Sequence, residues 1–207
     1  MTPKRRYSHY LAGAKKRNLS FDISFDEFIL FWGKSCFYCG EKIETIGLDR
    51  IDSLLGYSLE NIRSCCAECN RFKSNLSEKL FYKLVSNIKK NAKDLNLIKK
   101  AIVLPRYPDS NKLRESNSRY KIYKYTSKKY KRDFLLSKLQ FFSFWKKDCF
   151  YCGIKMGGVG IDRVDNKIGY VEGNCVPCCK TCNWMKSDLN IKQFKAHINK
   201  INNYLNL

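Results

Sequence analysis

The sequence contains pairs of cysteines separated by two residues, and each pair can bring two thiolates from one tight turn to the same metal ion. Two such pairs lie roughly 27 residues apart, and the whole arrangement recurs 113 residues later, as from Cys36 to Cys149. Four thiolates hold zinc tetrahedrally at about 2.3 Å, and a closed set of four leaves no open position for catalysis. The sequence therefore predicts two structural zinc ions per chain. The expected ligands are Cys36, Cys39, Cys66 and Cys69 in the first copy and Cys149, Cys152, Cys179 and Cys182 in the second.

The three remaining cysteines are expected to be small buried residues rather than ligands. Cys65 and Cys178 occupy equivalent positions next to a ligand, and adjacent thiols cannot easily both face one ion. Cys175 forms an alternative C-x-x-C pair with Cys178, but its counterpart in the first copy is Ile62. We therefore leave Cys175 out of the zinc site.

Between and after the cysteine pairs, both copies carry carboxylate, guanidinium and amide side chains in one order. This order is C-x-x-C-G, then Gly-φ-Asp-Arg-φ-Asp, Gly-Tyr, Asn and C-C-x-x-C-Asn-x-x-Lys-Ser, where φ is apolar. It resembles the HNH endonucleases with a ββα-metal fold, particularly the small phage and mobile-element type, over nearly all of both halves. The resemblance implies an α+β chain of two tandem, zinc-stabilised ββα-metal modules with flanking helices, which hydrolyses phosphodiester bonds in DNA.

The resemblance also implies a role for each side chain in this order. The strand Asp and the helix Asn would bind one Mg²⁺ or Mn²⁺ ion that stabilises the leaving 3′-oxygen, and the middle Asn would orient the base or the loop. The family usually has His after the strand Asp, whereas this chain has Arg, which cannot accept a proton at physiological pH. The second Asp is then the candidate for the base or for an extra metal ligand, and the Arg would stabilise charge on the phosphate. The catalytic candidates are Asp49, Arg50, Asp52, Asn61 and Asn70, and Asp162, Arg163, Asp165, Asn174 and Asn183.

Short structural elements must position these side chains. Ser24-Phe-Asp-Glu27 and Ser137-Lys-Leu-Gln140 are capping-box patterns, which predict a short aromatic-rich helix before each first cysteine pair. β-Prone runs at 46–51 and 159–164 predict hairpins, and apolar residues at helical spacing predict helices over 78–88 and 191–205. Two prolines place a linker between the halves. The expected domains are 1–104, with a basic N-terminal helix, and 114–207, joined by the linker 105–113.

Basic residues far outnumber acidic ones in this chain. Lys and Arg number 40 against 19 Asp and Glu, and the net charge of +21 attracts polyanions, so nucleic acid, most simply double-stranded DNA, is the expected partner. Basic residues interleaved with tyrosines at 4–17 and 119–132 predict helices that contact phosphates or a solvated face over a small aromatic core, and both can hold for different residues. The expected phosphate contacts are Arg5, Arg6, Lys15, Lys16, Arg17, Lys128 and Lys129, to which the resemblance adds Lys73 and Lys186.

The sequence has no apolar run of the ~18 residues that a membrane span requires and no apolar signal segment after its first charges. We therefore expect an intracellular, reducing compartment with free thiols and no membrane partner. The abundance of Lys, Asn, Ile, Tyr and Phe indicates an AT-rich genome such as that of a virus or organelle.

Two non-enzymatic interpretations fit the same charge and motifs. One is a catalytically inactive zinc protein of this fold that binds DNA or RNA, and the other is a structural component of a larger RNA–protein assembly. An Asp–Arg pair that only locks the hairpin would explain the motif in either case. An open, hydrated position for a divalent ion at the strand Asp distinguishes the enzyme from the binder. The sequence carries no signal of the oligomeric state.

Overall fold

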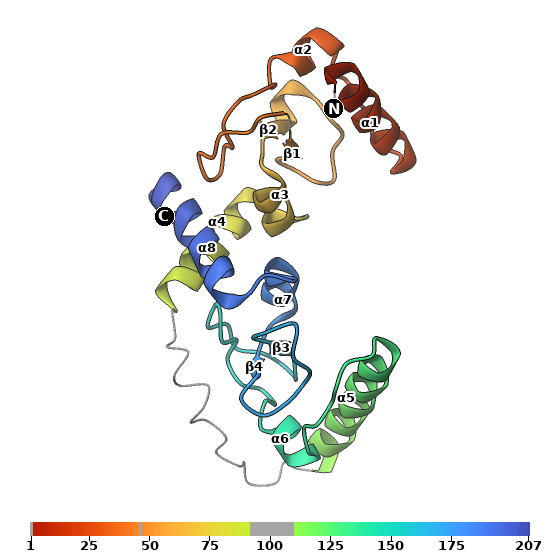
Figure 1. The fold of residues 1–207 in the computed structure, drawn as a ribbon, viewed down its shortest axis with the longest axis vertical. Coiled ribbons are helices and arrows are strands. Elements are labelled where there is room, and N and C mark those ends of the chain that lie inside the picture. Colours follow the sequence, from red (N-terminus) through yellow and green to blue (C-terminus); the bar gives the residue numbers. More distant parts are fainter. Residues whose placement is uncertain (1, 46, 92–109) are drawn as a thin grey trace. The chain divides into compact units, whose positions relative to one another are not determined.

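The computed structural model describes residues 2–45, 47–91 and 110–207, of which 110–116 are described by their backbone only (Figure 1). Most of the linker expected at 105–113 lies outside these residues, and its last four positions begin a helix. The chain divides into two compact units. Unit 1 comprises Met1–Ser86 together with Ile198–Leu207, and unit 2 comprises Asn87–His197.

Unit 1 combines short helices with one two-stranded antiparallel sheet. Its strands β1 and β2 pair with Asp49 opposite Arg63. The first half of the chain contains, in order, α1 (Pro3–Lys16), α2 (Phe25–Ile29), β1 (Leu48–Arg50), the 3-10 helix η1 (Leu59–Asn61), β2 (Ile62–Ser64), α3 (Ala67–Lys73) and α4 (Glu78–Lys90), whose last residues belong to unit 2.

Unit 2 has the same order of α-helices and strands, without a counterpart of η1 among its described residues. Its strands pair antiparallel with Asp162 opposite Val176, so the hairpin has the register of unit 1. The elements are α5 (Ser110–Lys129), α6 (Lys138–Phe142), β3 (Ile161–Arg163), β4 (Cys175–Pro177), α7 (Lys180–Lys186) and α8 (Ile191–Leu205), whose last residues belong to unit 1. The described part of the chain is thus a mixed α+β protein.

Local hydrogen bonds start the short helices where the sequence predicts them. In α2 the Ser24 hydroxyl accepts from the Glu27 amide, and the Glu27 carboxylate accepts from the Ser24 amide. Ser137 and Gln140 make the same reciprocal pair at α6. Both predicted capping boxes are therefore confirmed, including the Gln that replaces Glu.

A small aromatic core ties the long first helix of each unit to its hairpin. The Tyr10 hydroxyl on α1 accepts a hydrogen bond from the Leu48 amide of β1 at 2.8 Å, and its ring packs edge-on against Phe28. On α5 the Tyr123 hydroxyl accepts from the Ile161 amide of β3 at 3.0 Å. Tyr10 and Tyr123 of the two basic helices therefore face the core, whereas Tyr125 on α5 is 71% exposed.

A close approach of two backbone segments fixes where each hairpin begins. The Cys65 amide donates to the Gly47 carbonyl at 2.8 Å, and a Cβ added at Gly47 would collide with the Cys65 carbonyl. Gly160 meets Cys178 in the same way. Only glycine fits at these positions, which hold each hairpin against the second cysteine pair.

Candidate functional site

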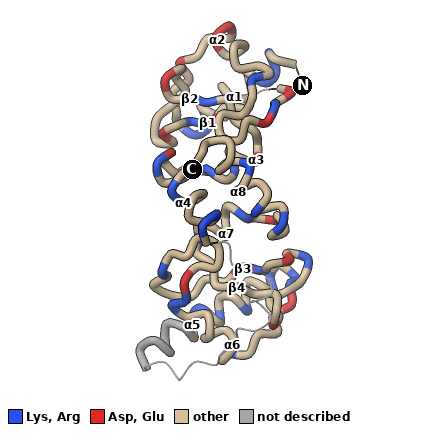
Figure 2. Tube along the Cα trace, turned by 90° about the vertical axis from the view of Figure 1, so that its left-hand side faces the viewer, with Lys and Arg blue, Asp and Glu red and all other residues tan. Residues whose placement is uncertain are grey.

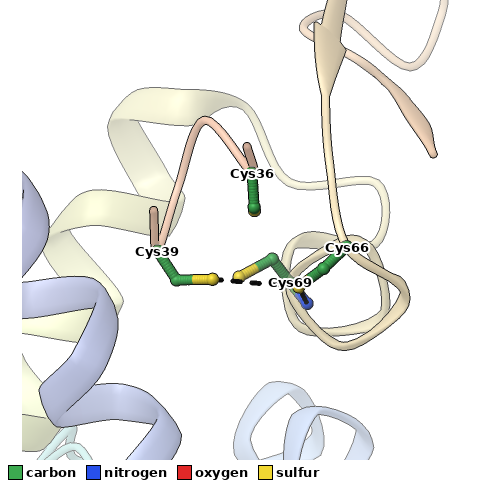
Figure 3. Close-up of side chains that lie close together, drawn as sticks. All are labelled: Cys36, Cys39, Cys66 and Cys69. Atoms are coloured by element: carbon green, nitrogen blue, oxygen red, sulfur yellow. Dashed lines mark hydrogen bonds between the residues drawn. The ribbon is translucent and has the colours of Figure 1, made fainter. Parts of the chain in front are cut away.

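The first four-cysteine group lies where the turn after α2 meets the start of α3 (Figure 3). Cys36 and Cys39 come from the turn, Cys66 and Cys69 come from the start of α3, and their four Sγ atoms lie within 4.8 Å of one another. The Sγ atoms of Cys39 and Cys66 are 3.9 Å apart. Tetrahedral zinc with bonds of about 2.3 Å separates its sulfur ligands by about 3.8 Å, so the group fits a zinc ion.

The second group reproduces this geometry in unit 2. The Sγ atoms of Cys152 and Cys179 are 3.8 Å apart, and all four sulfurs again lie within 4.8 Å. The Cys179 sulfur caps α7 by accepting from the Cys182 amide at 3.4 Å, and the Cys149 sulfur accepts from the Cys179 amide at 3.3 Å. Amide donors stabilise thiolates, so both predicted groups are confirmed as clusters that could bind zinc.

Hydrogen bonds among the thiols separate their pKa values. Those from neighbouring thiols, Cys39 first, hold the pKa of Cys36 far below its usual range. The pKa of Cys69 is raised, first because its thiol donates to Cys36. A metal-free cluster thus keeps protons that must leave when four thiolates bind zinc, and zinc affinity falls as the pH falls.

The remaining cysteines lie beside these groups without joining them. The Sγ atoms of Cys65 and Cys178 each donate to the carbonyl oxygen of the following residue at 3.3 Å, and both side chains are buried. Cys175 lies in the apolar core of unit 2 with Ile161 and Phe141. The expectation that these three residues are not ligands agrees with their placement.

Each strand Asp lies buried against a tyrosine and a lysine from its own unit. The Asp49 side chain is only 4% exposed, and its Oδ2 atom accepts from the Tyr38 hydroxyl at 2.7 Å and pairs with Lys73 Nζ at 3.0 Å. Lys73 is fully buried and also donates to the Arg50 carbonyl at 2.7 Å. Burial raises the pKa of Asp49, while the hydrogen bonds from Tyr38 and Lys73 oppose that rise.

Unit 2 contains the same cluster. Asp162 is 3% exposed, and its Oδ2 atom accepts from Tyr151 at 2.6 Å and lies 3.2 Å from Lys186 Nζ, which also donates to the Arg163 carbonyl at 2.9 Å. Burial again raises the pKa of Asp162 against the opposing effect of Lys186. Lys73 and Lys186 were expected to contact phosphate. Both are fully buried instead, and each pairs with a buried carboxylate.

The arginine after each strand Asp holds the loop that follows. Arg50 Nη1 donates to the carbonyls of Ser53 and Leu55 at 2.7 and 2.6 Å, and the guanidinium lies 5.4 Å from the Tyr57 ring centre. Arg163 makes the equivalent contacts and lies over Tyr170. In the structure this arginine binds backbone and a ring rather than the carboxylate beside it.

The second Asp and the middle Asn stabilise the same loop. Asp52 Oδ1 accepts from the Leu54 amide at 2.9 Å, so its carboxylate caps a turn. Asn61 accepts from the Asp52 amide at 2.9 Å and donates to the Gly56 carbonyl at 2.8 Å. In unit 2 the same contacts recur at Asp165 and Asn174. The loop-orienting role expected of the middle Asn is consistent with these bonds.

A pocket of about 390 Å³ in unit 2 brings the strand Asp and the helix Asn to one surface. Asp162, Arg163 and Asn183 all line it, whereas Asp165 and Asn174 do not. Asn183 is half-buried on α7, and its counterpart Asn70 on α3 donates to the Leu48 carbonyl at a long 3.5 Å.

The pocket also contains charged residues that the sequence reasoning missed. Arg132 and Asp188 line it together with Asp162. Neither has a charged counterpart in the first copy, where the equivalent residues are Leu19 and Asn75. A motif shared by both copies therefore does not include them. The tyrosines that donate to each strand Asp were also missed, although the Cys-Phe-Tyr-Cys segment recurs in both copies.

The basic residues predicted to contact phosphates differ in their solvent exposure and in their contacts. Lysines and arginines occur along both units (Figure 2), and Arg5, Lys15, Lys16, Lys128 and Lys129 are exposed on α1 and α5.

Tyrosines contact the other two basic residues predicted in this region, Arg6 on α1 and Arg17 directly after it. The Arg6 guanidinium lies 5.3 Å from the Tyr10 ring centre, and Arg17 donates to the Tyr57 hydroxyl at 3.0 Å. A groove of about 640 Å³ along α5 adds further basic residues. The cations that line it are Lys121, Lys124, Lys128, Arg132 and Lys138.

A viral protein is similar to this chain in sequence. Over 188 residues, which cover 88% of its length, the chain is 30% identical to the uncharacterized protein R423 of Acanthamoeba polyphaga mimivirus. The chain spans only 34% of that protein's length. No family model matches the chain.

One solved structure is also similar. PacI, a rare-cutting HNH restriction endonuclease, aligns over 39% of this chain and 71% of the PacI chain, at 27% identity and a TM-score of 0.35.

Among the described residues, none of the helices is both long enough and apolar enough to cross a membrane.

Proposed function

We propose that the chain is a metal-dependent endonuclease of the HNH type that hydrolyses phosphodiester bonds in DNA, with the chemistry in unit 2. The convergence of Asp162 and Asn183 on one pocket with Arg132 and Asp188 is the observation that carries this proposal. The net charge of +21 supports a polyanionic substrate.

The oxygen ligands of this pocket suit a hard divalent ion. Carboxylate and amide oxygens are the groups that Mg²⁺ and Mn²⁺ prefer, and Asp162 and Asn183 supply one of each. A bound ion would act as a Lewis acid on the scissile phosphate. Tyr151 and Lys186 hold the Asp162 carboxyl group in place, since both donate to it, and they oppose the rise of its pKa that burial causes.

Asp188 replaces Asp165 as our candidate proton acceptor. Asp188 lines the pocket together with Asp162, whereas Asp165 does not. A carboxylate there can take the proton of an attacking water. Arg132 would stabilise charge on the phosphate, because Nη1 of Arg163 is already engaged by two carbonyls.

For unit 1 we propose binding rather than cleavage. The residues at the positions of Arg132 and Asp188 are Leu19 and Asn75, which provide neither a cation nor a proton acceptor. The exposed cations of α1 remain available for phosphate contacts in unit 1.

A non-catalytic DNA-binding or RNA-binding protein is the second candidate. One observation favours it: each strand Asp is already neutralised by a buried lysine, at 3.0 Å in unit 1 and 3.2 Å in unit 2. In this alternative the cluster stabilises the hairpin and no divalent ion binds there.

Cleavage of supercoiled plasmid with Mg²⁺ or Mn²⁺ separates the two candidates. We expect Asn183→Ala and Asp188→Asn each to lower the rate about a hundredfold or more, because each removes a group that acts on the reaction. Asn70→Ala in unit 1 is the matched control and should leave the rate within about threefold. Zinc content and thermal melting must match the wild type.

Two results would contradict the nuclease assignment. Cleavage that survives both unit 2 changes would place the chemistry elsewhere. A wild-type chain that binds DNA but cuts it with neither ion would favour the non-catalytic binder.

A further inference from the structure

A second pocket of about 470 Å³ in unit 2 shares Asn183 with the pocket described above. Cations stand around it, namely Arg119 on α5, Lys155 before the hairpin and Lys180 at the start of α7. One wall is the glycine-rich turn at 157–158, which offers backbone without side chains.

Trp184 forms an aromatic face of this pocket. Its side chain is 69% exposed, and no aromatic ring among the described residues stacks on it. It follows Asn183 directly on α7, so the ring belongs to the same helix as the proposed ion ligand. A large, exposed aromatic surface among cations is the combination that binds the bases and phosphates of unpaired nucleic acid.

Unit 1 lacks this combination at the equivalent positions. Arg71 stands in place of Trp184 and pairs with Glu68 at 3.5 Å, and Ala67 stands in place of Lys180. The glycine at 157 corresponds to Glu44, which would repel phosphate. The exposed tryptophan is therefore not required by the fold that the two copies share.

We propose that this pocket binds an unpaired nucleobase, which stacks on Trp184 while Lys155, Lys180 and Arg119 contact the adjoining phosphates. Every base has a π-face, and single-stranded segments of DNA and RNA both present bases that are free to stack on aromatic side chains. The proposal extends the proposed function. It rests on that function only in one respect, namely that the bound strand lies beside the proposed ion ligand Asn183. Binding itself requires no cleavage.

Fluorescence anisotropy with a labelled short single strand of DNA, an RNA of the same sequence and the matching duplex tests the proposal, without added divalent ion. We expect Trp184→Ala to weaken single-strand binding about tenfold, since it removes one base stack. Duplex binding should change by less than about twofold, because paired bases cannot reach the pocket. Trp184→Phe should retain most of the affinity. The DNA and RNA arms show which strand the pocket prefers.

Tyr130→Ala is the matched control, because this tyrosine is 55% exposed in unit 2 and lines none of the three pockets described. It should leave single-strand affinity within about twofold. Unchanged single-strand binding by Trp184→Ala would overturn the proposal, and so would an equal loss on duplex and single strand. A tenfold selective loss in a protein that never cuts plasmid would uphold the pocket and reject the nuclease.

Discussion

The buried carboxylate of each strand Asp depends on one lysine for its charge balance. Lys186→Met would leave Asp162 buried and ionised without its cation, and we expect unit 2 to lose about 3–5 kcal/mol of unfolding free energy. Urea unfolding of the zinc-loaded protein measures this loss. Adding Asp162→Asn should restore more than half of it, because the double variant removes both charges.

Lys73→Met provides the matched test in unit 1, where the ion pair has nearly the same geometry. It should lower the stability of unit 1 while the transition of unit 2 stays in place. A loss below about 1 kcal/mol in both units would show that these pairs contribute no more than exposed ones.

Histidine in place of Arg163 restores the side chain that the HNH resemblance leads one to expect, but it removes two hydrogen bonds to the loop carbonyls. We expect Arg163→His to destabilise unit 2 by about 1–3 kcal/mol, because a buried side chain loses two hydrogen bonds that hold the loop. We also expect no gain in plasmid cleavage. A thermal melt and the plasmid assay check both points, and faster cleavage would reinstate this position as the site of the base.

At the scale of elements, exposed cations of α1 should set the salt dependence of binding. Lys15→Gln with Lys16→Gln removes two exposed cations that we propose contact phosphates, and it should reduce the slope of log affinity against log salt by about 2 on duplex DNA. Arg17 is left unchanged because it donates to the Tyr57 hydroxyl. Titrations at several salt concentrations measure the slope.

Lys79→Gln with Lys83→Gln is the matched control, since it removes the same charge from exposed positions on α4. The control should alter the slope by less than half as much. Equal effects of the two double variants would assign the salt dependence to net charge rather than to α1.

The elements that local chemistry determines were predictable from sequence. Capping hydroxyls begin α2 and α6 at the predicted serines, and helical spacing of apolar residues predicted α8 at 191–205, as the structure has it. Thiol spacing predicted the two cysteine groups, because two-residue gaps restrict where sulfurs can meet.

The parts of the site that depend on distant contacts were not predictable. From sequence alone a lysine in a short helix is expected to be solvated. Lys73 is instead buried, because strand β1 places Asp49, 24 residues earlier in the chain, beside it. Asp188 and Trp184 interrupt the repeat, and a comparison that seeks matching positions discards them. Only the folded chain shows that both line pockets that include Asn183.

At the scale of the whole molecule, each unit holds its own four-cysteine group. Cys39→Ser should reduce bound zinc from two ions to one and abolish the unfolding transition of unit 1, since metal binding contributes directly to folding. Cys152→Ser should do the same to unit 2. Elemental analysis with calorimetry measures both, and loss of both ions from either variant would contradict independent metal binding.

The division into units does not follow the two sequence copies, and this predicts how separate halves will behave. In unit 1 the ring of Tyr204 lies where a side chain on Gly40 would be, and Asn202 donates to the Val85 carbonyl at 3.0 Å. In unit 2 the equivalent position is taken by Asn91, which stands 113 positions before Tyr204 in the sequence. Asn91 lies against Gly153 and donates to the Phe150 carbonyl at 3.0 Å.

Separate halves, 1–104 and 114–207, would therefore each lack a residue that supports their own first cysteine pair. We expect both halves to bind zinc at least tenfold more weakly than the whole chain, because the lost contacts are worth about 1–3 kcal/mol. In the whole chain, Tyr204→Ala should weaken zinc binding in unit 1 alone and Asn91→Ala in unit 2 alone. Competition with a chromophoric chelator measures each affinity, and Lys192→Gln is the control, since it removes an exposed cation from α8. Halves that hold zinc as tightly as the whole chain would show that the two sequence copies are independent domains.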